Sequence, residues 1–231
     1  MASLVLSGSA LLAACGGDGG GSLGGGSTLS LNGTAATGKA LVGAVSATCK
    51  TGTGSGTSNS DGSFTVLINN GVGPCLLSIT AGATTLYSVT SGSGATQTGN
   101  ITPMTNMLVR YLRSVPGMED NTSPESWFAL ATTRALLADT PALTLRITRD
   151  FIPELKKMLP SLSLSSAGFL STAFTANPLT STDDADLEKL LKALIVTVTG
   201  LPSEAAIKAL VAAAIDDIRA VFATGATGAG S

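Results

Sequence analysis

The sequence predicts an α+β protein in which a small disulfide-bridged β-sandwich is followed by an α-helical bundle. Three observations lead to this prediction: short alternating apolar runs in the first half, a cysteine pair within them, and helix-type periodicity in the second half. Charge placement marks the boundary between the halves near residue 100. Of the 13 basic and 15 acidic residues, those that precede this point are Asp18, Lys39, Lys50 and Asp61.

The first half contains four short runs in which apolar and polar residues alternate, as they do in strands with one buried face. A turn is expected at residues 59–62, because Asn, Ser, Asp and Gly are typical turn residues. Glycine-containing turns between short strands are typical of a small β-sandwich. The four runs cover residues 41–49, 64–68, 75–79 and 86–89.

Cys49 and Cys75 lie on the apolar sides of two of these runs. We therefore expect them to form a disulfide that crosses the core of the sandwich. Such a bridge suits an oxidising compartment. In the chain-entropy model it would stabilise the fold by about 3 kcal/mol. The alternative is a pair of buried free thiols.

Helix start signals, in which Ser or Thr precedes Pro, recur in the second half. Three such signals begin at Thr102, Ser123 and Thr140. Pro153 is expected to kink or split the third helix, and Trp127 is expected to anchor the second in the core. Two further helices with apolar stripes are expected over residues 183–198 and 202–221. Five or six helices of this kind predict a bundle packed on the sandwich.

The start of the chain contains the run Leu11-Leu12-Ala13-Ala14-Cys15-Gly16, which resembles the lipobox of bacterial lipoproteins. An apolar stretch precedes it, as in secretory signals, although no Lys or Arg stands before that stretch. The resemblance implies that Cys15 receives a diacylglycerol and becomes the acylated N-terminus, and that Gly16 directs export to the outer membrane. Gly-rich residues 16–28 predict a flexible tether. The alternative is a buried N-terminal element.

Two motifs of the first half read Gly38-Lys39-Ala40-Leu41-Val42-Gly43-Ala44-Val45 and Ser60-Asp61-Gly62-Ser63-Phe64-Thr65-Val66. They resemble carboxypeptidase regulatory-like domains, which are sandwiches of the transthyretin type. The resemblance implies that Asp61-Gly62 reverses the chain and that Phe64 is buried. The whole chain resembles uncharacterised lipoproteins of Gram-negative bacteria, which implies a structural or binding module. The predicted parts are signal peptide 1–14, acylated cysteine and tether 15–28, β-sandwich 29–101, α-helical domain 102–223 and flexible tail 224–231.

Several patterns needed for catalysis or ligand binding are missing or incomplete. The chain has no histidine, which argues against the common zinc sites and histidine-based hydrolases, and no cofactor is expected. Residues 33–40 nearly match a Walker A loop, but Ala40 stands where Ser or Thr would hold Mg²⁺. We therefore expect no nucleotide as a partner. Basic residues form no patch typical of nucleic-acid binding, so no nucleic acid is expected either.

A group of acidic residues near position 185 is a weak candidate for a metal site. An EF-type loop counted from Asp184 would need Gly and Glu at positions that hold Lys189 and Ile195. Acidic side chains in the first turn of a helix are also favoured by the helix dipole. We therefore expect no metal, and the weak candidates are Asp183, Asp184, Asp186 and Glu188.

Taken together, these features predict a lipid-anchored cell-envelope protein with a structural or binding role and no enzymatic activity. Its expected location is the bacterial outer membrane, facing the periplasm or the cell surface. The expected partners are the membrane, through the lipid on Cys15, and an envelope protein or polymer. The alternative is an envelope hydrolase, or an accessory subunit of an envelope enzyme, that uses carboxylates of the helical half.

Overall fold

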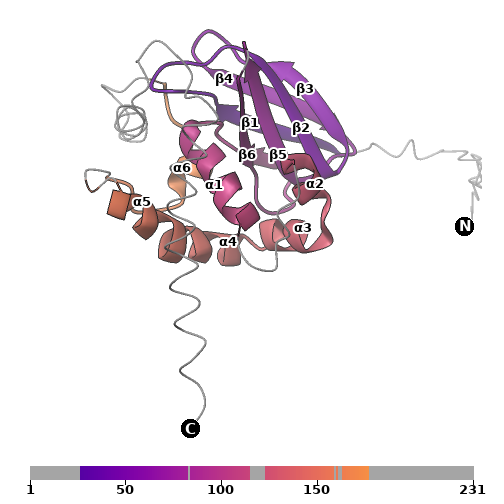
Figure 1. The fold of residues 1–231 in the computed structure, drawn as a ribbon. Helices are drawn as coiled ribbons and strands as arrows, with labels where there is room; N and C mark the ends of the chain where they lie inside the picture. The colour runs from indigo at the N-terminus through magenta and orange to yellow at the C-terminus, as the bar shows by residue number, and fades with distance from the viewer. Residues whose placement is uncertain (1–26, 83, 115–122, 159, 161–162, 177–231) are drawn as a thin grey trace, which may run out of the picture.

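The computed structural model describes residues 27–82, 84–114, 123–158, 160 and 163–176. In this part of the chain, two β-sheets stack as a sandwich and short helices pack beside them (Figure 1). Buried residues of the strands and of the helices belong to one hydrophobic cluster. The predicted α+β class and the sandwich-like arrangement are therefore confirmed.

One sheet has three strands in the order β4-β1-β7, and the other has four in the order β3-β2-β5-β6. Neighbouring strands pair antiparallel, except that β1 and β7 are parallel. The strands are β1 (Thr28–Thr34), β2 (Ala44–Thr51), β3 (Thr53–Thr57), β4 (Ser63–Asn69), β5 (Val72–Ala81), β6 (Thr84–Val89) and β7 (Thr96–Thr98).

The four alternating runs predicted as strands correspond to β2, β4, β5 and β6. In β4, for example, Phe64, Val66 and Ile68 are buried, while the residues between them are exposed. Strand β3 has no apolar residue, because its sequence is TGSGT. A Cβ atom at Gly54 would lie 2.8 Å from side-chain atoms of both Val66 and Ile68. Glycine in β3 therefore lets this strand lie close over β4 and brings the two sheets together along one side.

The helices begin with caps that the sequence largely predicts. Thr102 and Thr105 each accept a hydrogen bond from the other's backbone N–H at the start of α1, at 3.2 and 2.9 Å. Ser123 Oγ accepts from the Ser126 N–H at the start of α2. Asp139, rather than Thr140, caps α4 by accepting from the Ala142 N–H. The segments are α1 (Pro103–Ser114), α2 (Pro124–Ala129), α3 (Ala131–Ala138), α4 (Thr140–Arg146), the π-helical turn η1 (Ile147–Phe151), α5 (Ile152–Met158) and α6 (Gly168–Ser171).

The helical half differs from the predicted bundle. The second predicted helix is divided into α2 and α3 at Leu130, whose ψ of 137° is extended. Near Pro153 the helix widens into η1, where the Ile152 N–H donates to the Ile147 carbonyl, because proline removes a donor and its ring crowds the preceding turn. Trp127 is fully buried, as predicted. The expected bundle is not confirmed, and the helices predicted at 183–198 and 202–221 lie outside the described residues.

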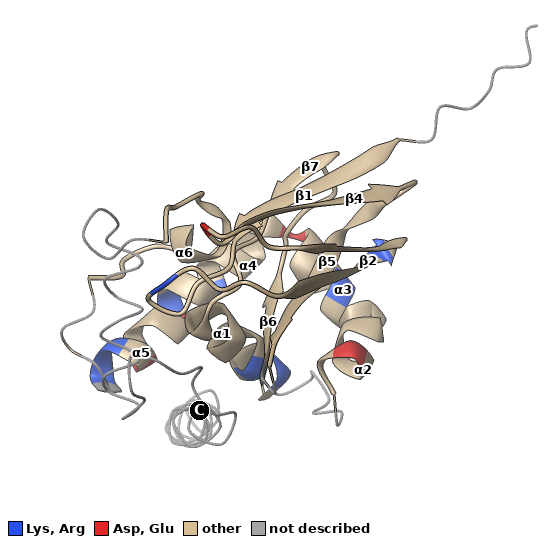
Figure 2. Cartoon of the chain, turned by 90° about the horizontal axis from the view of Figure 1, so that it is seen from above, with Lys and Arg blue, Asp and Glu red and all other residues tan. Residues whose placement is uncertain are grey.

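Helix α1 covers the outer edge of β6 (Figure 2). The Tyr87 N–H donates to Asn106 Oδ1 at 3.0 Å, and Thr105 Oγ1 donates to the Tyr87 carbonyl at 3.2 Å. An edge strand with free backbone groups would be a template for pairing with other chains. Side chains of α1 occupy both backbone groups of Tyr87, so the edge is closed at this residue.

Candidate functional site

The disulfide is the most distinctive covalent feature of the described residues. Cys49 and Cys75 are bonded, as predicted, and both are buried. The predicted path across the core was wrong, because the two residues lie directly opposite each other on β2 and β5 of the same sheet. Their Cα atoms are 3.9 Å apart. Inward-facing partners on adjacent antiparallel strands bring their Cβ atoms close, which suits a bridge within a sheet.

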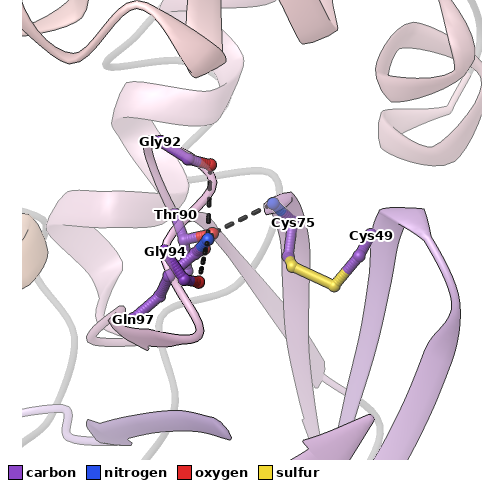
Figure 3. The surroundings of a disulfide bond; sticks show 6 residues. All are labelled: Cys49, Cys75, Thr90, Gly92, Gly94 and Gln97. Atoms are coloured by element: carbon purple, nitrogen blue, oxygen red, sulfur yellow. Dashed lines mark hydrogen bonds between the residues drawn. A yellow bond between two sulfur atoms is a disulfide. The ribbon is translucent and has the colours of Figure 1, made fainter. Parts of the chain in front are cut away.

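A chain of hydrogen bonds surrounds the backbone of Cys75 (Figure 3). The Cys75 N–H donates to Thr90 Oγ1 at 3.0 Å, and that hydroxyl donates to Gln97 Oε1 at 2.5 Å. Gln97 Nε2 donates to the carbonyls of Gly92 and Gly94, both at 3.2 Å. Thr90 and Gln97 are themselves buried. We call these two side chains, with Cys75, the disulfide corner.

The side chains of the disulfide corner hold neighbouring backbone segments in place through hydrogen bonds. The Gln97 amide accepts one hydrogen bond at its oxygen and donates two from its nitrogen, all within this segment. A Cβ atom at Gly73 would lie 2.1 Å from Gln97 Nε2, so glycine is required for the amide to reach this place. The Gly92 N–H also donates to the Leu137 carbonyl of α3 at 3.1 Å. The corner therefore ties β5 to the helices.

Buried polar side chains are concentrated where the chain passes from the strands to the helices. Seven of the ten buried polar residues of the described part lie between residues 88 and 106. We call this segment the polar junction; its buried members are Ser88, Thr90, Gln97, Asn100, Thr102, Thr105 and Asn106. Sequence reasoning missed these side chains as a group, because a polar run without apolar periodicity looks the same as an exposed loop.

Asn100 connects the sandwich to the last described helix. Its Oδ1 accepts from the Thr34 N–H of β1 at 3.1 Å. Its Nδ2 donates to the carbonyls of Phe169 and Thr172, at 3.1 and 2.8 Å. Asn100 has no exposed surface. One buried amide therefore satisfies three backbone groups that belong to segments about 70 residues from it in the sequence.

The aromatic residues of the helical layer form a second buried group. Tyr111 and Phe151 have ring centroids 5.4 Å apart, and Phe151 and Phe169 have centroids 6.1 Å apart. The Tyr111 hydroxyl is buried and has no hydrogen-bond partner among the described residues. Burial, with a smaller contribution from the Asp150 carboxylate, raises the pKa of Tyr111 to about 12. The hydroxyl therefore stays protonated at neutral pH.

Most carboxylates of the described helices have structural partners. Asp139 caps α4. Asp150 accepts two hydrogen bonds from the Arg149 guanidinium, at 2.7 and 3.1 Å, and Glu154 pairs with Lys157 at 2.6 Å. Within the described ranges, no three His, Cys, Asp or Glu side chains converge as a metal site. The weak metal candidates Asp183, Asp184, Asp186 and Glu188, and the lipidation candidate Cys15, lie outside the described residues.

The two sequence motifs of the first half form turns and strand ends. Asp61 Oδ1 accepts from the N–H and the hydroxyl of Ser63, at 2.9 and 2.7 Å, and these bonds lower the pKa of Asp61. Gly62 has a φ of 82°, and Phe64 is buried, as the resemblance implied. Residues 33–40, which nearly match a Walker A loop, form the end of β1 and a turn.

Comparison with family models, with curated proteins and with solved structures gives no match. The resemblance to carboxypeptidase regulatory-like domains and to Gram-negative lipoproteins therefore stays a prediction. Among the helices of the described part, none has the length and apolar character needed to cross a membrane.

Proposed function

We propose that this chain is a lipid-anchored protein of the bacterial outer membrane with a structural or binding role and no enzymatic activity. The observation that carries the proposal is the use of its three cysteines. Cys49 and Cys75 form a buried disulfide, which is expected of exported proteins and is rare in the cytosol. The remaining cysteine, Cys15, stands in the lipobox-like run, where an acylated cysteine is expected.

Within the described part of the chain, the geometry of the polar residues supports a binding or structural role rather than that of an envelope hydrolase. A hydrolase needs a nucleophile or a water activated by a positioned base. Asp139, Asp150 and Glu154 instead cap a helix or pair with neighbouring cations. The hydroxyl of Thr90 and the amide of Gln97 are used within the disulfide corner. Most polar side chains that the fold buries thus hold the backbone in place.

The proposal is tested by the covalent state of Cys15. We expect the full-length chain, expressed in a Gram-negative host, to appear in the outer-membrane fraction with the mass of a diacylglycerol added at Cys15. Cys15→Ser should lose the added mass and should leave the membrane fraction. The matched control is the double variant Cys49→Ser/Cys75→Ser, which should keep the lipid because its changes lie in the folded part. A Cys15→Ser protein that still fractionates with the membrane would contradict the proposal.

Two kinds of role can be distinguished by the side of the outer membrane on which the folded part of the chain lies. Protease added to intact cells would cut a chain that faces outward, as expected for adhesion or for capture of an extracellular polymer. Protection until the cells are permeabilised would place the chain in the periplasm, as expected for a scaffold that binds another envelope protein.

A further inference from the structure

We propose that the end of the sandwich where β1 begins contacts the surface of the lipid bilayer, an inference that rests on the proposed function. This end is defined by Thr28, the first residue of β1, and by its partner Asn69, the last residue of β4. The turn that follows Asn69 leads into β5 at Val72, which is opposite Thr51 of β2. The strand ends that surround Thr28 therefore come from both sheets. We call this region the Thr28 end.

The length of chain before the Thr28 end limits its distance from the bilayer. Thr28 lies thirteen residues after Cys15 in the sequence. For a Gly-rich composition of that length, a root-mean-square span of about 20 Å is expected, and no chain of that length reaches beyond about 45 Å. A lipid on Cys15 would therefore hold the Thr28 end close to the bilayer and raise its effective concentration at the surface.

Exposed aliphatic side chains are found at the Thr28 end. Four large hydrophobic residues are exposed in the described part of the chain, and two of them flank the turn after Asn69. They are Leu67, whose exposed fraction is 63 %, and Val72, whose exposed fraction is 36 %. Aliphatic side chains that leave water for the membrane interface lower the free energy of binding, as on the apolar faces of interfacial helices.

The charge that the strands carry near the Thr28 end also suits a bilayer. Lys50 is the one charged residue that the described strands carry, and it is exposed next to Thr51, the partner of Val72. A lysine near the surface is attracted to anionic headgroups, and its aliphatic stem can lie along the apolar layer. Asp61 lies in the turn before β4, at the opposite end of the sandwich. Figure 1 shows α5 and α6 on the other side of the molecule from the start of β1.

The test uses the full-length acylated protein in vesicles of phosphatidylethanolamine with phosphatidylglycerol as the minor component. Since Cys49 and Cys75 are bonded and Cys15 is acylated, a single introduced cysteine is the one thiol that a nitroxide reagent can label. Asn69→Cys places the label at the Thr28 end, and Ser60→Cys places it in the turn at the opposite end; both positions are exposed. Collisions of the label with oxygen and with a water-soluble nickel complex report its depth.

We expect the label at position 69 to collide with the nickel complex several-fold less often than the label at position 60. Adding Leu67→Asp and Val72→Asp should remove this protection. Adding Val42→Asp, which changes an aliphatic residue at the opposite end whose exposed fraction lies between those of Leu67 and Val72, should not. Equal collision rates at positions 69 and 60, in protein that floats with the vesicles, would overturn the contact while leaving the lipid anchor intact. Protein that carries no lipid and does not float would overturn both proposals.

Discussion

The strands of the sandwich and the helices beside them differ in how many charged side chains they carry. The described strands carry one charged residue, Lys50, whereas the helical segments from α1 to α5 carry ten. On the exposed positions of β2 and β3, Ser and Thr predominate. Of the ten charged side chains on the helices, Glu125, Arg149 and Lys157 are exposed and the other seven are half-buried. Arg, Lys and Glu suit helical positions because their long side chains lose little freedom there.

The surface side chains of the strands and of the helices do not explain how the two regions are joined. Between them lies the polar junction, in which Asn100 joins backbone groups of Thr34, Phe169 and Thr172 that are distant in sequence. Within the sandwich, stability comes from alternating apolar burial and from one disulfide. Between the sandwich and the helices, apolar side chains of both regions share one buried cluster, and single amide and hydroxyl side chains of the junction add hydrogen bonds to particular backbone groups. Substitutions in the two regions should therefore have separable effects.

Asn100→Ala is expected to have the largest effect, because it removes the amide that joins β1 to α6. Three backbone groups, at Thr34, Phe169 and Thr172, would lose their partner. The bonds to Thr34 and Phe169 are buried. At 1–3 kcal/mol for each of these two groups left unsatisfied, the free energy of unfolding should fall by about 4 kcal/mol. Urea unfolding followed by circular dichroism measures this change.

Asn59→Ala is the matched control for Asn100→Ala, since the Asn59 amide bonds Ser63 at an exposed site. It should cost less than about 1 kcal/mol. Hydrogen exchange sharpens the comparison: in Asn100→Ala, protection should fall first near α6 and the end of β1. Equal costs for the two substitutions would show that the junction is not what joins the sandwich to α6.

Loss of the disulfide is expected to act on the sandwich itself. Cys49 and Cys75 are 26 residues apart in the sequence, and a loop of that length corresponds to about 3–4 kcal/mol in the chain-entropy model. Reductant should lower the melting temperature, and hydrogen exchange should show the loss of protection in β2 and β5. The double variant Cys49→Ala/Cys75→Ala should melt at one temperature with or without reductant. An unchanged melting temperature of the natural chain in reductant would contradict this expectation.

Gly33→Ala tests how closely the sandwich approaches the polar junction. A Cβ atom at Gly33 would lie 2.1 Å from the Gly99 carbonyl oxygen and 2.7 Å from the Phe64 ring. Since the carbonyl belongs to the backbone, both segments must move, and we expect a loss of about 2 kcal/mol. The control is Gly94→Ala, where the nearest atom would be 3.5 Å away. If both variants unfold at the same urea concentration, the close approach has no energetic consequence.

The parts of the fold that follow local rules could be predicted from the sequence. Alternating burial predicted β2, β4, β5 and β6, and capping residues predicted the starts of α1 and α2. Strand β3 could not be predicted in this way, because Gly54 and Gly56 occupy its inward positions and leave no apolar period. Its close packing on β4 depends on the partner strand, and the single sequence contains no signal for that partner.

Of the candidate site, the sequence predicted the disulfide but not the buried polar side chains around it. The pairing of Cys49 with Cys75 follows from the cysteine count and from their apolar surroundings. The path of the bridge does not, since the alternation of side chains shows which face a residue occupies but not which strands are neighbours. Asn100 and Gln97 stand in a polar run, and their burial depends on segments that fold over them from far along the chain.

The smallest effect is expected from Tyr111→Phe in the helical layer. The hydroxyl of Tyr111 is buried without a partner among the described residues, so its removal should change the free energy of unfolding by less than about 1 kcal/mol at neutral pH. The aromatic contact with Phe151 would be kept. Leu112→Ala is the contrasting control, because it truncates a fully buried side chain of α1 and should cost about 3 kcal/mol.

The pH dependence of the free energy of unfolding tests whether Tyr111 has a different pKa in the folded and the unfolded chain. Burial raises its pKa to about 12 in the folded protein, above the ordinary value of about 10 expected in the unfolded chain. Above pH 10 the unfolded chain therefore loses this proton more readily than the folded protein, and stability falls as the pH rises towards 12. Urea unfolding at pH 8 and pH 11 should show a smaller decline for Tyr111→Phe than for the natural chain. If the free energy of unfolding falls equally in Tyr111→Phe and in the natural chain, the hydroxyl ionises with the same pKa in the folded and the unfolded chain. In that case α1 and η1 do not exclude water from it.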